Sequence, residues 1–235
     1  MTNLRRLILW DIDGTLVRAG PASLAAFDAA VRSVVGRDPG EHGVQFSGKT
    51  DPEIALEILA AMAMSDSEAT EHMPGVLRAL EHTLREGLGT IRRTGRVLPG
   101  VPEILSRLAG DPSVLQTVVS GNIEPNARLK LQAFGLDPWF DFESGGYGSD
   151  HHDRDRLVPI VLDKVAARHG VRPSMVWVVG DTLRDLACAR AGGALCLLVA
   201  TGWTPLEELR AGGADVVLSD LSDTEAVLRT LLDAG

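Results

Sequence analysis

The chain has 235 residues, of which 45% are hydrophobic, and its formal net charge at pH 7 is −9. That length and apolar content suffice for one sizeable domain, or for a core with a smaller insertion. The acidic balance argues against a nucleic-acid binder with a broad basic surface. No apolar run approaches the roughly 18 to 20 residues that a membrane span requires. We therefore expect a protein that binds neither nucleic acid nor membranes.

Cysteine usage and the N-terminal residues indicate the compartment. The two cysteines, Cys188 and Cys196, lie among apolar or small residues, where a buried reduced thiol is the commoner state. Asp11 interrupts the first apolar run too early for a signal peptide. We expect a cytoplasmic, untargeted protein that is a monomer or a homodimer.

In the first part of the chain, the pattern of apolar residues predicts one strand followed by helices. An apolar strand is expected at 7–10, and helical periodicity then continues to about residue 93. A helix is predicted over 21–35. A second is expected to start at Asp51, with this aspartate as its cap and a proline in the first helical position. A third begins with a capping box at Ser65, which has a glutamate three residues later. We interpret this block as a helical insertion.

Strands and helices alternate in the rest of the chain. The expected strands cover 114–119, 139–142, 175–179, 195–199 and 215–218, and the expected helices cover 125–134, 157–169, 183–191 and 224–232. Apolar strands that alternate with helices are typical of a doubly wound parallel sheet with helices on both faces. We therefore predict an α/β fold with a Rossmann-like core of residues 1–16 and 96–235 and an inserted helical cap of residues 17–95.

Two acids end the first strand. Because side chains alternate along a strand, Asp11 and Asp13 emerge on the same side while Ile12 points into the core. Gly14 lets the backbone turn close to a ligand, and Thr15 offers a hydroxyl group. An ordinary Asp-Gly turn explains Asp13 but not Asp11, since a buried unpaired charge needs a partner such as a metal ion.

Polar residues also follow the strand expected at 114–119. Ser120, Gly121 and Asn122 supply a hydroxyl, a flexible backbone and an amide, although such a sequence is also an ordinary turn. The charged segment 150–156 then precedes a helix. Its adjacent histidines suggest zinc, but no cysteine or spaced histidine completes a ligand set. We favour a solvated loop with one basic residue facing inward.

A second pair of acids follows the strand expected at 175–179. If a helix starts there, Asp181 and Asp185 are four residues apart on one face, where like charges repel by about 0.2–0.5 kcal/mol. A divalent cation would remove that penalty. Alternatively, Thr182 caps the helix with Asp185 at its third position, which leaves Asp181 unexplained.

Together these segments resemble the haloacid dehalogenase superfamily, in its phosphatase branch with a helical C1-type cap, and are similar to the phosphoglycolate phosphatases. Residues 11–16 resemble the first motif, Ser120 the second and residues 180–185 the fourth. The third motif usually contains a lysine, and this chain offers Arg156 at a similar distance, with Arg154 as its rival. Arginine can hold a phosphoryl group and is always charged.

The resemblance implies a role for each of these residues. Asp11 would attack phosphorus to form an aspartyl-phosphate, while Asp13 would protonate the leaving alkoxide and later deprotonate the attacking water. The cofactor would be Mg²⁺, held by Asp11, the backbone carbonyl of Asp13, Asp181 and, through water, Asp185. The phosphoryl group would be held by the turn at Gly14, by Thr15, Ser120 and Arg156, and by the amides of Gly121 and Asn122.

The cap is expected to close over this site and to select the leaving group. Lys49 is the only lysine of the insertion, and the segment 48–51 resembles the substrate-facing loop of related caps. Lys49 is therefore a candidate substrate ligand, although a surface lysine beside a helix cap explains it equally well.

The sequence thus predicts a Mg²⁺-dependent hydrolase of a small soluble phosphate ester. A phosphomutase of the β-phosphoglucomutase type is the nearest alternative, because a similar core would return the phosphoryl group to a sugar. A non-catalytic protein that keeps this fold is the other alternative, although its clustered acids would then destabilise it without a metal.

Overall fold

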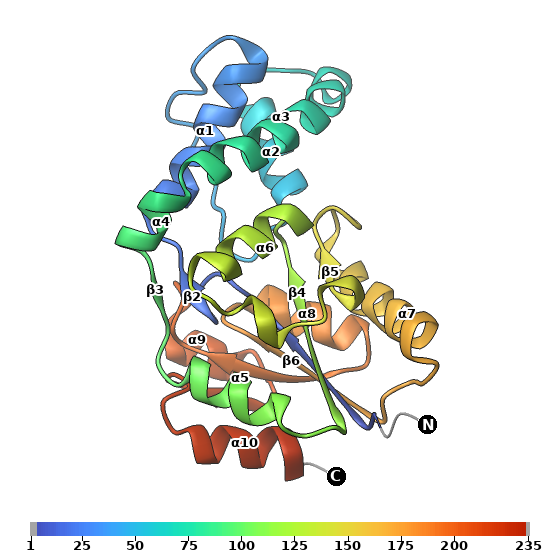
Figure 1. Ribbon diagram of the computed structural model, residues 1–235. Coiled ribbons are helices and arrows are strands. Elements are labelled where there is room, and N and C mark those ends of the chain that lie inside the picture. Colours follow the sequence, from blue (N-terminus) through green and yellow to red (C-terminus); the bar gives the residue numbers. More distant parts are fainter. Residues whose placement is uncertain (1–3, 234–235) are drawn as a thin grey trace.

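A six-stranded sheet forms the centre of the molecule in the computed structural model, which describes residues 4–233 apart from the side chains of Ala22, Leu24 and Asp233 (Figure 1). The strand order is β5-β4-β1-β6-β7-β8, and every neighbouring pair in this sheet is parallel. The strands are β1 (Arg6–Trp10), β4 (Val114–Ser120), β5 (Gly146–Tyr147), β6 (Met175–Gly180), β7 (Leu195–Val199) and β8 (Val216–Leu218). The prediction of a doubly wound parallel sheet is confirmed.

Side-chain alternation along β1 divides the core into two apolar layers. Ile8 and Trp10 are fully buried on one face, against α5 (Val101–Ala109), α6 (Glu124–Ala133) and α10 (Thr224–Asp233). Leu7 and Leu9 are fully buried on the other face, against α7 (Leu157–His169), α8 (Leu183–Ala191) and α9 (Leu206–Ala211). The carboxyl end of β1 therefore lies between two covered faces, where a parallel sheet places its ligands.

Four helices pack into a separate apolar cluster beyond the carboxyl ends of the strands. They are α1 (Pro21–Val35), α2 (Asp51–Ala61), α3 (Asp66–Glu86) and α4 (Leu88–Thr94), and Figure 1 shows them above the sheet. A short antiparallel ribbon of β2 (Val17–Arg18) and β3 (Arg96–Val97) connects them to the core. Val17 packs in the core cluster and Ala19 in the helical cluster. The chain thus passes from the core cluster to the helical cluster between Val17 and Ala19. This supports a cap over residues 17–95, whose boundaries remain a prediction.

Two predictions of helix caps can be compared with the structure. The capping box of Ser65 and Glu68 is present. The cap of α2 is Thr50 rather than Asp51, because the Thr50 hydroxyl accepts a hydrogen bond from the Glu53 amide and Asp51 is the first helical residue.

The strand predicted at 139–142 is wrong. Two short 3-10 helices, η1 (Asp137–Trp139) and η2 (Phe142–Ser144), occupy this region and the edge strand β5 follows them. Phe140 and Phe142 are both buried in the core, and apolar residues two positions apart are also the pattern expected of a strand.

Among residues 4–233, none of the helices is both long enough and apolar enough to span a membrane.

Candidate active site

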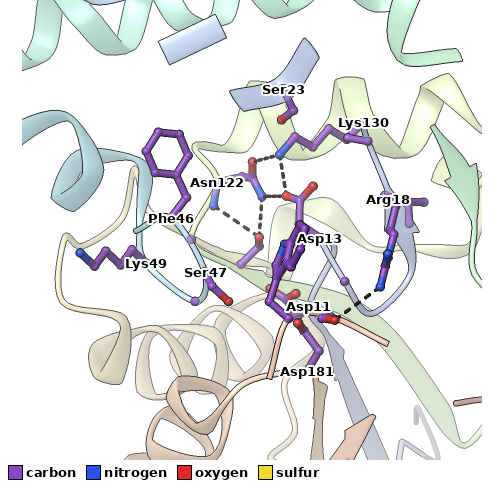
Figure 2. Close-up of a pocket in the computed structure, with 18 of the residues that line it drawn as sticks. Asp11, Asp13, Arg18, Ser23, Phe46, Ser47, Lys49, Asn122, Lys130 and Asp181 are labelled. Carbon is purple, nitrogen blue, oxygen red and sulfur yellow. Dashed lines mark hydrogen bonds and ion pairs between the residues drawn. The ribbon is translucent and has the colours of Figure 1, made fainter. Parts of the chain in front are cut away.

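The carboxyl ends of three neighbouring strands meet at one cavity of about 510 Å³ (Figure 2). Asp11 follows β1, Ser120 ends β4 and Asp181 follows β6, and all three line the cavity together with Asp13. Because β1 lies between β4 and β6, the parallel register places these strand ends side by side. The structure thus brings together segments that are far apart in the sequence.

Two glycines make room for Asp181. A Cβ atom on Gly14 would lie 2.5 Å from Asp181 Oδ2, and one on Gly202 would lie 1.6 Å from the same oxygen. Gly14 also has a φ of +94°, which favours glycine. Thr15 is fully buried and its hydroxyl donates to Asp181 Oδ1 at 3.3 Å. Thr15 therefore holds Asp181 in place, and the structure does not bring it to the cavity surface as a phosphate ligand.

Arg154, rather than Arg156, supplies the basic group beside Asp11. The Arg154 side chain is 5% exposed, and its Nη2 donates to Asp11 Oδ1 at 2.8 Å and also pairs with Asp185. The Arg156 side chain is 69% exposed, and its one ion-pair partner among residues 4–233 is Asp153, at 4.0 Å. Both arginines belong to the 3-10 helix η3 (Arg154–Arg156), in which residues two apart point about 240° apart. The assignment of Arg156 to the third motif is thus corrected.

Asp185 supports Arg154 and does not line the cavity. Its Oδ1 pairs with Arg154, while its Oδ2 accepts hydrogen bonds from the Thr182 amide, the Thr182 hydroxyl and the Asp181 amide. The capping box with Thr182 is therefore present, as one of the two alternatives predicted. Both carboxylate oxygens of Asp185 thus accept hydrogen bonds from protein donors, and its predicted role as a metal ligand through water stays a prediction.

The buried site carries more negative than positive charge. Asp11, Asp181 and Asp185 are at most 5% exposed, and Arg154 is the cation that contacts two of them. Burial, reinforced by Asp185, raises the pKa of Asp11 to about 7. Burial and the nearby Asp11 charge likewise raise the pKa of Asp181 well above its ordinary value. A further cation beside Asp11 and Asp181 would stabilise their ionised forms.

A magnesium ion fits the donors that face the cavity. Within residues 4–233, no three His, Cys, Asp or Glu side chains are grouped closely enough to hold a metal by themselves. Magnesium needs no such cage, because it binds through one or two carboxylates and keeps water and phosphate oxygens in its other positions. Asp11 and Asp181 offer two carboxylates, and the backbone carbonyl of Asp13 is a third candidate donor.

Lys130 on α6 was not singled out by the sequence analysis. It is 5% exposed, and its Nζ donates to Asp13 Oδ2 at 2.5 Å and to Asn122 Oδ1 at 2.7 Å. Asn122 Nδ2 in turn donates to Asp13 Oδ2 and to Ser120 Oγ, both at 2.9 Å. Figure 2 shows this network above Asp11. One feature of the sequence could have indicated Lys130: lysine is rare in this chain, and this one lies beside the apolar residues Ala127 and Leu131, which are buried.

The remaining predicted ligands lie where the cap meets the core. Gly121 allows a close approach, because a Cβ atom on it would lie 2.0 Å from the Lys49 carbonyl oxygen. Lys49 lines the cavity, but its Nζ pairs with Glu57 Oε1 at 2.6 Å and, in Figure 2, points away from Asp13. Glu57 thus neutralises the Lys49 ammonium, and the contact between Lys49 and substrate stays a prediction.

Three contacts hold the segment that contains Lys49 against the core. The Arg154 guanidinium donates to the Gly48 carbonyl at 3.1 Å, the Thr50 hydroxyl to the His152 carbonyl at 2.7 Å, and the Asp51 amide to the Gly121 carbonyl at 2.7 Å. Helices α1 to α4 therefore cover a site whose acids come from the sheet.

Comparison with known proteins identifies the family. The profile of haloacid dehalogenase-like hydrolases matches residues 8–190. The chain belongs to this family. The relative named "Probable phosphatase IndB" from Dickeya dadantii is 25% identical over 229 residues, which cover 97% of this chain and 96% of the relative. The phosphoglycolate phosphatase of Vibrio vulnificus is 26% identical over 230 residues, covering 92% and 93% of the two chains.

A solved structure shows the same fold. It is described as a predicted phosphoglycolate phosphatase from Haemophilus somnus, and it matches with a TM-score of 0.64 and 20% identity over 97% of this chain and 99% of that one. The expected membership in the haloacid dehalogenase superfamily, with phosphatases among its relatives, is confirmed.

Proposed function

We propose that this haloacid dehalogenase-family enzyme is a Mg²⁺-dependent phosphomonoester hydrolase that transfers the phosphoryl group of a small soluble ester to Asp11 and then to water. The observation that carries the proposal is the different environment of the two neighbouring acids. Asp11 is buried between Arg154 and Asp181, while the Asp13 side chain is 41% exposed and bonded to Lys130. One acid is thus placed for attack on phosphorus and the other for proton transfer.

Magnesium would be held by Asp11, Asp181 and the Asp13 carbonyl. When bound, it would neutralise negative charge on the phosphate and on the attacking carboxylate. A carboxylate attacks an anion poorly unless such charge is neutralised. The raised pKa of Asp11 agrees with this role, because a cation at the site lowers the pKa and keeps the nucleophile ionised at neutral pH.

In the first half of the reaction, an Asp11 oxygen forms a bond to phosphorus while the bond between phosphorus and the leaving oxygen breaks. Asp13 gives its proton to that oxygen, so that a neutral alcohol departs. Arg154, Ser120 and the amides of Gly121 and Asn122 surround the place where the phosphoryl oxygens would lie. In the second half, Asp13 takes a proton from water, the water oxygen bonds to phosphorus, and the bond to Asp11 breaks.

The test is phosphate release from a panel of phosphate esters, measured with Mg²⁺, with a chelator, and with Asp11→Asn in Mg²⁺. We expect turnover by the wild type in Mg²⁺ and a loss of at least about 10³-fold in Asp11→Asn, since a nucleophile is removed. Asp163→Asn is the matched control, because the Asp163 side chain is 76% exposed and does not line the cavity. Equal turnover by Asp11→Asn would remove Asp11 as the nucleophile. A product that keeps its phosphate on another carbon would identify a mutase.

A further inference from the structure

Five basic side chains line the cavity, and three of them are already paired with carboxylates. Arg154 pairs with Asp11, Lys130 with Asp13 and Lys49 with Glu57. The other two are Arg18 and Arg96. Within residues 4–233, neither of these arginines has an acidic side chain within ion-pair distance.

Arg18 and Arg96 face each other across the ribbon that connects core and cap. They are directly opposite in the antiparallel register of β2 and β3. Side chains at such positions lie on the same face, and like charges placed opposite each other are destabilising. Both side chains line the cavity, so this face of the ribbon is turned toward the active site. The repulsion would be relieved by an anion bound between them.

The Arg18 guanidinium is held in position by backbone groups. Its Nε donates to the Thr201 carbonyl at 3.2 Å and its Nη2 to the Gly202 carbonyl at 3.4 Å. The guanidinium also lies 6.0 Å from the ring centroid of Trp203, whose side chain is 83% exposed. These contacts are with neutral groups, so they leave the Arg18 charge without an acidic partner among residues 4–233. In Figure 2, Arg18 lies on the opposite side of Asp13 from Phe46 and Lys49.

Arg96 is the less constrained member of the pair. It is exposed, and no hydrogen bond or ion pair engages its guanidinium within the described part of the chain. An exposed arginine at the cavity edge can adjust to a ligand and present a planar, two-pronged donor to a carboxylate or phosphate. Arg18 is thus a fixed cation and Arg96 an adjustable one, and both line the same cavity as Asp13, the acid that would protonate the leaving group.

We propose that Arg18 and Arg96 form an anion subsite for the leaving group. The preferred substrates are therefore phosphate monoesters whose leaving group carries a second anionic group, either a carboxylate or another phosphate. This inference rests on the proposed function, because it assigns the leaving-group side of the same cavity. A cavity of about 510 Å³ has room for a small ester of this kind.

The test compares pairs of esters that differ mainly in the second charge: phosphoglycolate against phosphoglycolamide, and 3-phosphoglycerate against glycerol 3-phosphate. The measured quantity is the ratio of kcat/KM for the anionic ester to kcat/KM for the neutral one. We expect a ratio of at least about 10 in the wild type and a decrease of about 10-fold in Arg96→Gln, since one charge-assisted hydrogen-bonding partner is lost. Arg18→Gln should lower the ratio in the same direction.

Arg92→Gln is the matched control, because Arg92 lies four residues before Arg96 in the last turn of α4, is exposed and does not line the cavity. It should keep the wild-type ratio. A wild-type ratio near one, or an equal loss for both members of each pair in Arg96→Gln, would overturn the subsite.

Binding to Asp11→Asn separates this inference from the proposed function. Dissociation constants for the same pairs, measured by calorimetry, do not require turnover. If no ester is hydrolysed but the anionic members still bind about 10-fold more tightly through Arg96, the proposed function fails and the subsite stands. If esters are hydrolysed without any preference for a second charge, the subsite fails and the proposed function stands.

Discussion

The two sides of the cavity differ in how their charges are arranged. On the side of the sheet, Asp11 and Arg154 are each 5% exposed, and they bond to each other and to neighbouring groups. On the side of the cap and the connecting ribbon, the lining includes the apolar residues Phe27 and Phe46 and also Arg96, which has no ion-pair partner among residues 4–233. The sheet side holds the groups for phosphoryl transfer in fixed positions. The other side leaves surface that a leaving group can occupy.

The largest effect is expected for Arg154, which tests whether the sheet side depends on its buried ion pairs. Arg154→Met leaves Asp11 and Asp185 without their cation, and we expect the free energy of unfolding to fall by about 3–5 kcal/mol. Phosphate release should fall with it. Arg156→Met is the matched control and should change stability by less than about 0.5 kcal/mol, because the Arg156 side chain is 69% exposed.

Arg154→Lys distinguishes charge from geometry. It keeps a cation near both acids, so it should recover part of the stability lost in Arg154→Met, as measured by urea unfolding. It cannot reproduce the forked contact with Asp11, Asp185 and the Gly48 carbonyl, so activity should stay low. If Arg156→Met were the more damaging of the two methionine variants, the reassignment of the third motif would be wrong.

A smaller effect is expected at Asp51, which links the cap to the core. Asp51 Oδ2 accepts hydrogen bonds from the Ile123 amide at 2.8 Å and from Asn126 Nδ2 at 3.3 Å. Burial raises the pKa of Asp51 to about 6, although the Lys130 charge opposes this shift. The folded state thus favours the protonated acid. Its contribution to stability is fully present below about pH 4 and is lost as the pH rises through about 6.

Urea unfolding of the wild type and Asp51→Asn between pH 4 and pH 7, in chelator, measures this contribution. The wild type should lose up to about 3 kcal/mol relative to the asparagine variant across that range, from the size of the shift at about 1.4 kcal/mol per pKa unit. The same comparison with Asp163→Asn should show no such trend. A constant difference between the wild type and Asp51→Asn would mean that Asp51 titrates normally.

The smallest effect is expected at Lys130, whose role is to position Asp13. Lys130→Met should lower kcat by about 10- to 100-fold, part of what general acid catalysis contributes. The loss should be larger for an alkyl phosphate than for p-nitrophenyl phosphate, whose leaving group hardly needs a proton. Lys164→Met is the control, since Lys164 pairs with Asp150 and does not line the cavity. An equal loss for both esters would indicate a merely structural lysine.

The sequence predicted the sheet and the positions of the strand-end acids because both depend on local patterns. Apolar runs marked the strands, and a polar residue after each run marked the edge where Asp11, Ser120 and Asp181 now lie together. The direction in which a side chain points could not be predicted from such local patterns. Arg154 and Arg156 are equivalent by spacing, and only the 3-10 turn decides which of them is buried.

The partners of a side chain were the other feature that the sequence could not supply. The sequence predicted Lys49 as a candidate ligand but did not indicate that its ammonium pairs with Glu57, eight residues away. Lys130 reaches Asp13 across 117 positions of the chain, so no local pattern could pair them. Pairing of the groups on the cap side depends on such distant contacts, so local sequence patterns do not predict which of them can bind a leaving group.

Trapping the covalent intermediate tests the central claim most directly. Asp13→Asn should be mixed with p-nitrophenyl phosphate and Mg²⁺, quenched with acid and digested, and the peptides analysed by mass spectrometry. This ester needs little help in leaving, while loss of the Asp13 base slows hydrolysis of the intermediate. We predict one added phosphoryl group on Asp11, and none in the variant that also carries Asp11→Asn. Release of p-nitrophenol with the phosphoryl group on another residue would contradict the assignment of Asp11 as the nucleophile.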